Sequence, residues 1–360
     1  MKVGVHKIAM ASPNDVSELM ALIEDGTIDP KAVVAVIGKT EGNGGANDFT
    51  RGYATLAFAL ALAPHRGQSA DEVMDDIAFV WSGGTEGVLS PHATVFTRTT
   101  TGTEASHPDG RLALGIAMTR DIRPEEIGTL THVEEVADAV RRAQQDAGIP
   151  DGADVHYVQV KGPLLSPEKI ADADSRGRPL VTRDPNGSKP YARGAMALGV
   201  GLGLGEISGE TVTADTIAKD MSVFSRVAST SAGGELTKCE ILLFGNAPNS
   251  SSNCRIGHAI LKDAIDAGGT RAALADAGYT DEDGPDAILA VFAKGEAAAK
   301  IRGRRTTMMS DADIHFERHA RAAAGAVIAS VTGDPAIFLS GGTEHQCAPG
   351  EAPVAAIVKA

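Results

Sequence analysis

The chain has 360 residues, of which 43% are hydrophobic and only 4% aromatic. This length provides for two or three domain-sized units, and the core must be built mainly from Ala, Val, Leu and Ile. The formal net charge of −14 argues against nucleic acid as the main partner, because phosphate binding requires a positively charged surface. The three cysteines, Cys239, Cys254 and Cys347, are scattered and odd in number, so we expect reduced thiols rather than a disulfide framework.

The N-terminal segment MKVGVHKIAM lacks an apolar run long enough for a signal peptide. No other stretch approaches the length and hydropathy of a membrane span. We therefore expect a cytoplasmic protein that does not associate with membranes.

Helix starts are marked at four places, where a Ser or Thr that could cap the helix is followed by proline or an acidic residue. These are Ser12-Pro13-Asn14-Asp15, Thr131-His132-Val133-Glu134, Ser166-Pro167-Glu168 and Thr213-Ala214-Asp215. The second start leads into an amphipathic helix over residues 134–147. Short apolar runs predict buried strands at residues 33–37, 77–81, 155–160, 241–244, 288–292, 336–339 and 354–358. Because strands and helices alternate, the predicted class is α/β.

The same three features recur three times along the chain. Each copy has a strand that ends on a lysine, an aromatic-x-Arg triplet that opens an Ala/Gly-rich helix, and a strand that leads into a serine followed by small residues. The lysines are Lys39, Lys161 and Lys294; the triplets are Phe49-Thr50-Arg51, Tyr191-Ala192-Arg193 and Phe316-Glu317-Arg318; the serines are Ser82, Ser231 and Ser340. We therefore predict three homologous repeating units, A (1–103), B (111–247) and C (253–360), around a pseudo-threefold axis with a central active site.

Serine and lysine can together perform nucleophilic catalysis, since a lysine made neutral by burial can remove the proton from a serine hydroxyl. The small residues after each serine favour main-chain N–H groups turned toward an oxyanion. Arginines are suited to planar, oxygen-rich ligands, because a guanidinium donates two parallel hydrogen bonds. Three such sets imply a small ligand with near-threefold carbonyl symmetry. The alternative is structural: the lysines and arginines pair only with nearby carboxylates, and the serine segments are turns.

Three other patterns point to different sites, with less support. Gly38-Lys39-Thr40 resembles the end of a phosphate-binding loop, but Val33 stands where that loop requires its first glycine. The glycines from Gly199 to Gly205 lack the strand-then-helix context of a dinucleotide site and are predicted to continue a helix instead. His315 and His319 are spaced to bind a metal on one helix face, although hydrogen-bonded histidines explain them as well.

Six segments carry a resemblance to a known family. They are VIGKTEGNGGANDFTRGYA, FVWSGGTEGVLSPHATVF, HYVQVKGPLL, ASTSAGGEL, MMSDADIHFERHARAAAGAVIAS and LSGGTEHQ. Together they resemble the cyclic amide hydrolases, the family of cyanuric acid hydrolase and barbiturase, and the resemblance runs from about residue 5 to residue 360. It implies three repeating units around a pseudo-threefold axis, a homotetramer, and hydrolytic opening of a planar cyclic amide without an organic cofactor.

The resemblance also implies roles for individual residues. Ser231 would be the nucleophile and Lys161 its base, a choice among the three pairs that spacing alone does not make. Lys39 and Lys294 would hold the other two serines. Substrate would be bound by Arg51, Ser82, Gly83, Arg193, Ala232, Arg318, Ser340 and Gly341. A structural cation, usually Mg²⁺, would be held by Glu296 and by main-chain oxygens of the closing loop, at Thr343, Gln346, Cys347, Ala348 and Glu351.

The chain departs from the family pattern at two places. Cys347 and Glu351 stand in the closing loop where small residues are expected, and Phe316-Glu317 precedes Arg318 where small polar residues are expected. We expect cyanuric acid to be opened to carboxybiuret, which yields biuret and CO₂. Barbituric acid, opened to ureidomalonate, is the alternative substrate, followed by another cyclic amide. A non-catalytic small-molecule binding protein is the alternative from a different class.

Overall fold

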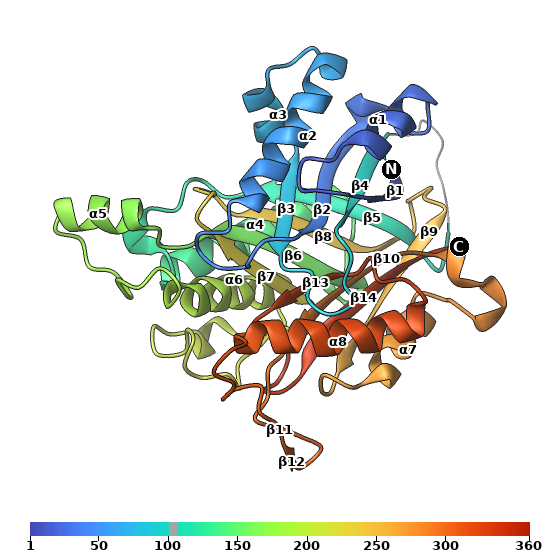
Figure 1. Cartoon of the computed structure of the whole chain (residues 1–360). Coiled ribbons are helices and arrows are strands. Elements are labelled where there is room, and N and C mark those ends of the chain that lie inside the picture. Colours follow the sequence, from blue (N-terminus) through green and yellow to red (C-terminus); the bar gives the residue numbers. More distant parts are fainter. Residues whose placement is uncertain (101–106) are drawn as a thin grey trace.

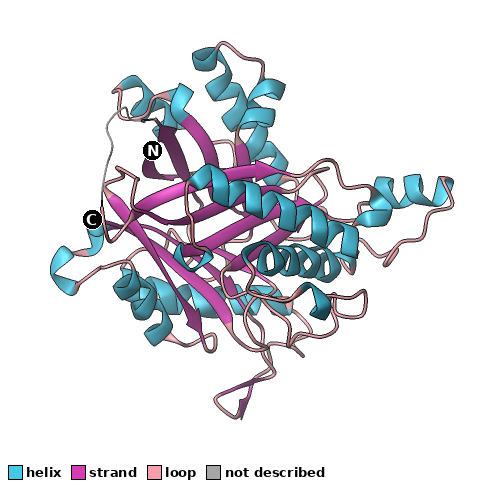
Figure 2. Cartoon of the chain, turned by 180° about the vertical axis from the view of Figure 1, so that it is seen from behind, coloured by secondary structure: helices cyan, strands magenta, loops and turns pink. Residues whose placement is uncertain are grey.

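The computed structural model describes residues 1–100 and 107–360. Strands occupy the middle of the molecule and helices surround them (Figures 1 and 2). The link predicted between units A and B, and the end of unit A at residue 103, fall partly on residues 101–106, which lie outside the described residues. Among the described residues, no helix is both long and apolar enough to cross a membrane.

Three four-stranded sheets with one shared topology form the framework. The first sheet has the order β1 (Lys2–Ala9), β4 (His92–Thr99), β2 (Val33–Thr40) and β3 (Ala78–Gly83). The second has the order β5 (Arg111–Met118), β8 (Glu240–Ala247), β6 (Val155–Pro163) and β7 (Ala228–Gly233). The third has the order β9 (Cys254–Leu261), β14 (Ala352–Lys359), β10 (Ile288–Gly295) and β13 (Phe338–Gly341). In each sheet two antiparallel pairings are followed by one parallel pairing, so the predicted three-unit α/β fold is confirmed.

Helices cover the outer faces of these sheets (Figure 2). They are α1 (Ser17–Glu24), α2 (Thr50–Arg66), α3 (Ala70–Asp76), α4 (Leu130–Ala147), α5 (Pro167–Ser175), α6 (Ser188–Leu204), α7 (Ala267–Asp276) and α8 (Phe316–Thr332). A small hairpin, β11 (Lys300–Ile301) with β12 (Arg304–Arg305), projects from the body (Figure 1). The long helices α2, α6 and α8 are the three Ala/Gly-rich helices expected after the arginine triplets.

The glycine series at residues 199–205 lies mostly within α6, which Gly205 caps in a left-handed conformation. A Cβ on Gly199 would lie 2.7 Å from the Val136 Cβ of α4, and one on Gly203 would lie 2.8 Å from the Val140 Cβ. These glycines therefore allow α4 and α6 to approach closely, and a dinucleotide loop is excluded.

The core between the sheets is shared by all three units. Phe96, Phe244 and Phe292 come from one unit each, with ring centroids 5.0 to 6.3 Å apart. Such offset aromatic contacts stabilise a core beyond simple burial of area. The three units are thus joined along a common apolar centre rather than linked as separate domains.

Two of the four predicted helix starts are wrong. The Ser12 side chain bonds to Asn14, and α1 begins only at Ser17. Thr213 bonds to Thr216 in a run of turns, so no helix begins there. In both cases short polar side chains bond locally instead of capping a helix. The start at Ser166 is confirmed by its cap on the Lys169 N–H, and the 134–147 helix begins slightly earlier, at Leu130.

The predicted strands are all present, but the strand that opens each sheet was missed, as was β4. β1, β5 and β9 lie at sheet edges with mixed burial. β1 and β9 carry charged residues or histidine within the strand, so they lack the continuous apolar run of a strand buried on both faces. β5, RLALGIAM, is apolar after its first residue, and its burial does not explain why it was missed.

Candidate active site

Each lysine lies directly opposite a serine in the parallel pairing of its unit. β2 and β3 pair Lys39 with Ser82, β6 and β7 pair Lys161 with Ser231, and β10 and β13 pair Lys294 with Ser340. The three lysine side chains are almost fully buried. The recurrence of Lys and Ser in the sequence is therefore a recurrence of one strand register.

The three lysines also join the units in a ring. Lys39 Nζ donates to the Leu339 carbonyl at 2.7 Å, Lys161 Nζ to the Trp81 carbonyl at 3.1 Å, and Lys294 Nζ to the Thr230 carbonyl at 2.8 Å. Each acceptor immediately precedes the serine of another unit. Unit A thus binds unit C, unit B binds unit A, and unit C binds unit B, as a pseudo-threefold axis requires.

A cavity at the centre brings together the three serines, three arginines and, of the three strand lysines, Lys161. Its lining includes Arg51, Ser82, Gly83, Lys161, Arg193, Ser231, Ala232, Arg321, Ser340 and Gly341. All the predicted substrate-binding positions except Arg318 are therefore brought together. The cavity is formed by all three units, and no single unit could provide it.

The third arginine of the cavity is Arg321 rather than Arg318. The Arg318 side chain is 45% exposed, whereas that of Arg321 is 3% exposed and lines the cavity. Arg321 is the sixth residue of α8, as Arg193 is of α6. The prediction that Phe316-Glu317-Arg318 is the third triplet is therefore wrong, because the arginine in the cavity lies three residues later. The matching segment is His319-Ala320-Arg321, whose Ala-Arg step also occurs at Ala192-Arg193.

Sequence reasoning also missed a glutamate four residues after each serine, namely Glu86, Glu235 and Glu344. Each pairs with the arginine of another unit through one or two guanidinium nitrogens. Arg321 contacts Glu86 twice at 2.7 Å, Arg193 contacts Glu344 twice at 2.7 Å, and Arg51 Nε lies 3.0 Å from Glu235. The signal was present in SGGTE, SAGGE and SGGTE. These pairs fix the guanidinium planes at the cavity wall.

Unit B breaks the symmetry at its serine. Lys39 Nζ donates to Ser82 Oγ at 3.2 Å, and Lys294 Nζ donates to Ser340 Oγ at 3.0 Å. Ser231 Oγ is buried without a hydrogen-bond partner, and Lys161 Nζ lies 3.4 Å from Glu235 instead. Buried hydroxyls are normally satisfied, so the Ser231 hydroxyl is the one of the three that is free to engage a ligand.

Burial lowers the pKa of all three lysines, because a charged ammonium is poorly solvated inside the protein. The pKa of Lys161 falls to about 8 and that of Lys294 to about 7, and that of Lys39 is also well below its usual value. For Lys161, the Glu235 carboxylate opposes this effect and the Arg51 guanidinium adds to it. A lysine with a pKa near neutrality can exchange a proton with a serine hydroxyl at physiological pH.

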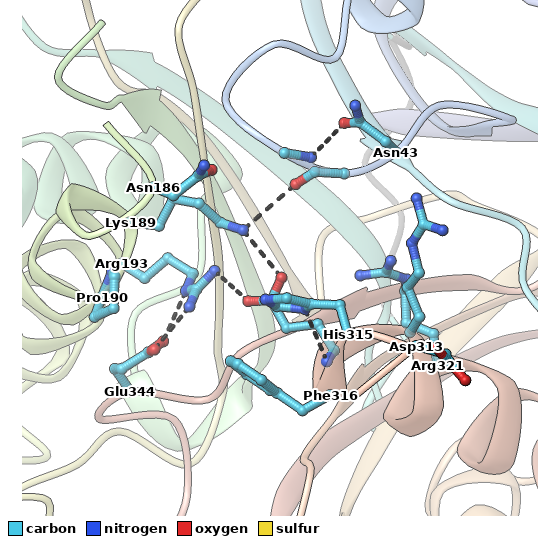
Figure 3. Close-up of a pocket in the computed structure, with 14 residues that line it drawn as sticks. Asn43, Asn186, Lys189, Pro190, Arg193, Asp313, His315, Phe316, Arg321 and Glu344 are labelled. Carbon is cyan, nitrogen blue, oxygen red and sulfur yellow. Dashed lines mark hydrogen bonds and ion pairs between the residues drawn. The ribbon is translucent and has the colours of Figure 1, made fainter. Parts of the chain in front are cut away.

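A second cavity leads outward from the first. The two share Gly44, Lys189, Arg193, Glu317 and Arg321 in their linings. Figure 3 shows Lys189 and Arg193 extending from α6 into this region, and each lies 3.0 Å from the Glu317 carboxylate. Arg193 therefore uses its guanidinium on two carboxylates, Glu317 and Glu344. The unexpected Glu317 thus forms the neck between the cavities, and Phe316 lies in the outer one.

Of the residues expected at a structural cation, Glu296 and Thr343 are in contact, and the others follow Thr343 in the same loop. Thr343 Oγ1 donates to the Glu296 carboxylate, and burial raises the pKa of Glu296. The Gln346 side chain is already bonded to the main chain at Thr230. The Cys347 thiol is buried with a raised pKa. Gln346 and Cys347 could thus contribute only main-chain oxygens, and these together with a buried carboxylate fit a hard cation such as Mg²⁺.

His315 and His319 do not converge on a common point. His315 Nδ1 accepts from the Glu317 N–H at the start of α8, and His319 Nε2 lies 3.0 Å from Asp311. Both are hydrogen-bonded histidines. The three cysteines are free and buried, as expected.

Known proteins similar to this chain cover its whole length. Residues 4–359 match the family described as amidohydrolase ring-opening protein. A protein of Azorhizobium caulinodans named cyclic amide hydrolase is 68% identical, over 100% of both chains. A cyanuric acid amidohydrolase of Bradyrhizobium diazoefficiens is 49% identical, over 99% of this chain and 98% of that protein.

The fold also matches a solved structure closely. A structure described as cyanuric acid hydrolase, with evolutionary innovation by structural concatenation, superposes with a TM-score of 0.95 at 46% identity, covering 100% of this chain and 99% of the other. The three concatenated units, the shared central cavity and the full-length family match agree with one another. The chain belongs to the amidohydrolase ring-opening family, the cyclic amide hydrolases.

Proposed function

We propose that this cyclic amide hydrolase opens the ring of cyanuric acid. The observation that carries the proposal is the Ser231 hydroxyl, which is buried without a partner in a cavity lined by one serine and one arginine from each of the three units. Cyanuric acid has three equivalent ring carbonyls, so its symmetry matches that of the cavity. Relatives that carry the name cyanuric acid amidohydrolase support this choice.

In the proposed reaction, neutral Lys161 accepts the Ser231 hydroxyl proton while Ser231 Oγ forms a bond to a ring carbonyl carbon. The adjacent main chain at Ala232 lies where it could stabilise the oxyanion. The carbon–nitrogen ring bond then breaks, and the leaving nitrogen takes the proton from the Lys161 ammonium. Water hydrolyses the acyl-enzyme to carboxybiuret, which loses CO₂ to form biuret.

The other two units bind rather than react in this mechanism. Ser82 and Ser340 are engaged by Lys39 and Lys294, so their hydroxyls are oriented to donate to the remaining ring oxygens. The guanidinium of Arg321 has nitrogen donors beyond those used by Glu86, and these can reach a substrate oxygen. Substrate would thus be held in plane from three sides.

A small cation such as Mg²⁺ would be held by Glu296 and main-chain oxygens of the closing loop, where it would supply positive charge to a buried carboxylate. The Gln346 side chain connects this loop to the strand of Ser231 through Thr230. The loop would therefore position the nucleophile strand. A homotetramer, and the absence of an organic cofactor, are part of the same proposal.

Barbituric acid is the second candidate substrate, because the family includes a relative named barbiturase. The observation that favours it is Glu317, which makes the third side of the cavity unlike the other two. Barbituric acid has one carbonyl, between its two nitrogens, that differs from the other two, so its ring could use such an asymmetric wall.

The test is loss of ring ultraviolet absorbance when purified protein is incubated with cyanuric acid or with barbituric acid. Turnover of cyanuric acid alone supports the proposal, and turnover of barbituric acid alone transfers it to the second candidate. Absence of turnover with both would overturn both substrates and leave another cyclic amide or a binding protein.

A further inference from the structure

Two histidines and an aspartate converge where the sheets of units B and C meet, outside the central cavity. His156 lies near the start of β6, His258 in β9, and Asp276 at the end of α7. His156 precedes Lys161 by five residues, which corresponds to roughly 16 Å along a strand. The cluster is therefore separate from the catalytic residues and from the Glu296 set.

The three potential ligand atoms form a compact triangle. His156 Nδ1 lies 2.9 Å from His258 Nδ1 and 3.2 Å from Asp276 Oδ2, and His258 Nδ1 lies 3.8 Å from the same oxygen. Ligands about 2.0–2.1 Å from a tetrahedral Zn²⁺ are about 3.3 Å apart. The observed separations bracket this value, so small rotations of the rings would equalise them.

Few protons are available between the three groups of the cluster. Burial lowers the pKa of both imidazoles, which favours their neutral form. Of two facing Nδ1 atoms only one can donate to the other, which leaves lone pairs of nitrogen and carboxylate directed at one point. The Asp276 carboxylate is held in this orientation by the His258 main-chain N–H at 2.9 Å. A cation at this point would satisfy all three groups.

The junction between units A and B provides an internal comparison. There Asp146 accepts from the Ile116 N–H at 2.9 Å, as Asp276 accepts from the His258 N–H. Both carboxylates lie close to a glycine that packs against the helix end, Gly115 or Gly257. Asp146 is paired with the guanidinium of Arg98. Within the described part of the chain, Asp276 has no Lys or Arg partner, only the two imidazoles.

We propose that His156, His258 and Asp276 form a transition-metal site of the Zn²⁺ class that joins units B and C. The metal takes the structural place that the Arg98 guanidinium has at the other junction. The Asp276 side chain is 45% exposed, so solvent can provide the fourth ligand. Two nitrogen ligands select Zn²⁺ or Co²⁺ over Mg²⁺, which prefers an all-oxygen shell.

The experiment uses the full chain, freed of metal with a chelator and titrated with Co²⁺ and then with Zn²⁺. We expect one Co²⁺ per chain with the visible absorption of a tetrahedral site, displaced by Zn²⁺. His156→Gln and His258→Gln should each weaken Co²⁺ binding by about 100-fold or more. Zn²⁺ should raise the Tm of the parent protein and not that of these variants.

Two control variants show whether binding depends on the His156, His258 and Asp276 cluster. Arg98→Gln alters the equivalent junction without a metal ligand and should bind Co²⁺ as the parent does, and so should Glu296→Gln. Asp276→Asn serves as a third ligand variant if a histidine variant does not fold. Failure of the parent protein to bind Co²⁺ or Zn²⁺, or equal binding by the parent and the ligand variants, would overturn the proposal. Metal binding and Tm are measured without substrate, so the outcome does not depend on turnover of cyanuric acid.

Discussion

Unit B differs from units A and C in the hydrogen bonds of its lysine and serine. In units A and C the lysine donates to the serine of its own unit, whereas in unit B the lysine faces Glu235 and the serine hydroxyl is free. The three strand registers are otherwise the same. Catalytic asymmetry can therefore arise within a threefold scaffold from one redirected side chain, without a change of fold.

The scaffold itself depends on contacts between units. Every lysine of the three pairs bonds to a carbonyl of another unit, and every cavity arginine pairs with a glutamate of another unit. Removing one partner of a buried charged pair is strongly destabilising, because the other charge loses its compensation. The active site and the association of the units are thus held by the same residues.

The largest expected effect distinguishes the three serines. Ser231→Ala should lower kcat for cyanuric acid by about 10⁴-fold, the scale for loss of a nucleophile. Ser82→Ala and Ser340→Ala remove a hydroxyl bonded to a lysine and should cost about 10- to 100-fold. Initial rates by ring absorbance measure all three. An active Ser231→Ala with an inactive Ser82→Ala or Ser340→Ala would move the nucleophile to another unit.

The next effect compares the two arginines of α8. Arg321→Lys loses the two-point contact with Glu86 and should lower kcat/KM by about 100-fold. Arg318→Lys, at a half-exposed side chain, should change it by less than about twofold. If Arg318→Lys were the damaging change, the third repeat would be aligned as the Phe316-Glu317-Arg318 triplet first indicated.

A smaller effect concerns pH. The pKa of Lys161 is about 8, so kcat/KM should rise with pH through this region as the amine becomes neutral. Glu235 raises this pKa, and Glu235→Gln should therefore move the rising limb to lower pH. Glu86→Gln is the matched control, because it disturbs an arginine pair in the same way without contacting Lys161. An unchanged limb in Glu235→Gln would argue against Lys161 as the base.

The smallest effect concerns the residue after the serine, which is glycine in unit A and alanine in unit B. A Cβ on Gly83 would lie 1.7 Å from Asp48 Oδ2. Gly83→Ala should therefore lower the free energy of unfolding by about 1–3 kcal/mol, as measured by urea denaturation. Ala232→Gly, the reverse change in unit B, should cost about 1 kcal/mol or less. Equal stability of Gly83→Ala and the parent would show that Asp48 can move aside.

Much of the site could be predicted from the sequence, because the same Lys–Ser pairing of parallel strands occurs in all three units and so repeats along the chain. Lys39, Lys161 and Lys294 mark strand ends, and the three serines follow at the matching ends of the paired strands. The aromatic-x-Arg pattern predicts Arg318, whereas the cavity arginine is Arg321. Residues three apart lie on nearly the same helix face. The two arginines differ in their distance from the start of α8, where Arg318 is the third residue and Arg321 the sixth. Which of them reaches the cavity depends on the residue at which the helix begins, and helix boundaries are poorly predicted from local sequence.

The sequence by itself determined the family, the three α/β units, and the lysines and serines that face each other, because these follow from local strand patterns repeated in order. Only the tertiary structure decided which arginine completes the cavity, which glutamates hold the arginines, and which serine is left without a partner. These depend on contacts between units far apart in the chain, such as Arg51 with Glu235 and Lys161 with Trp81. No local pattern encodes which side chains meet when the three units close around a common axis.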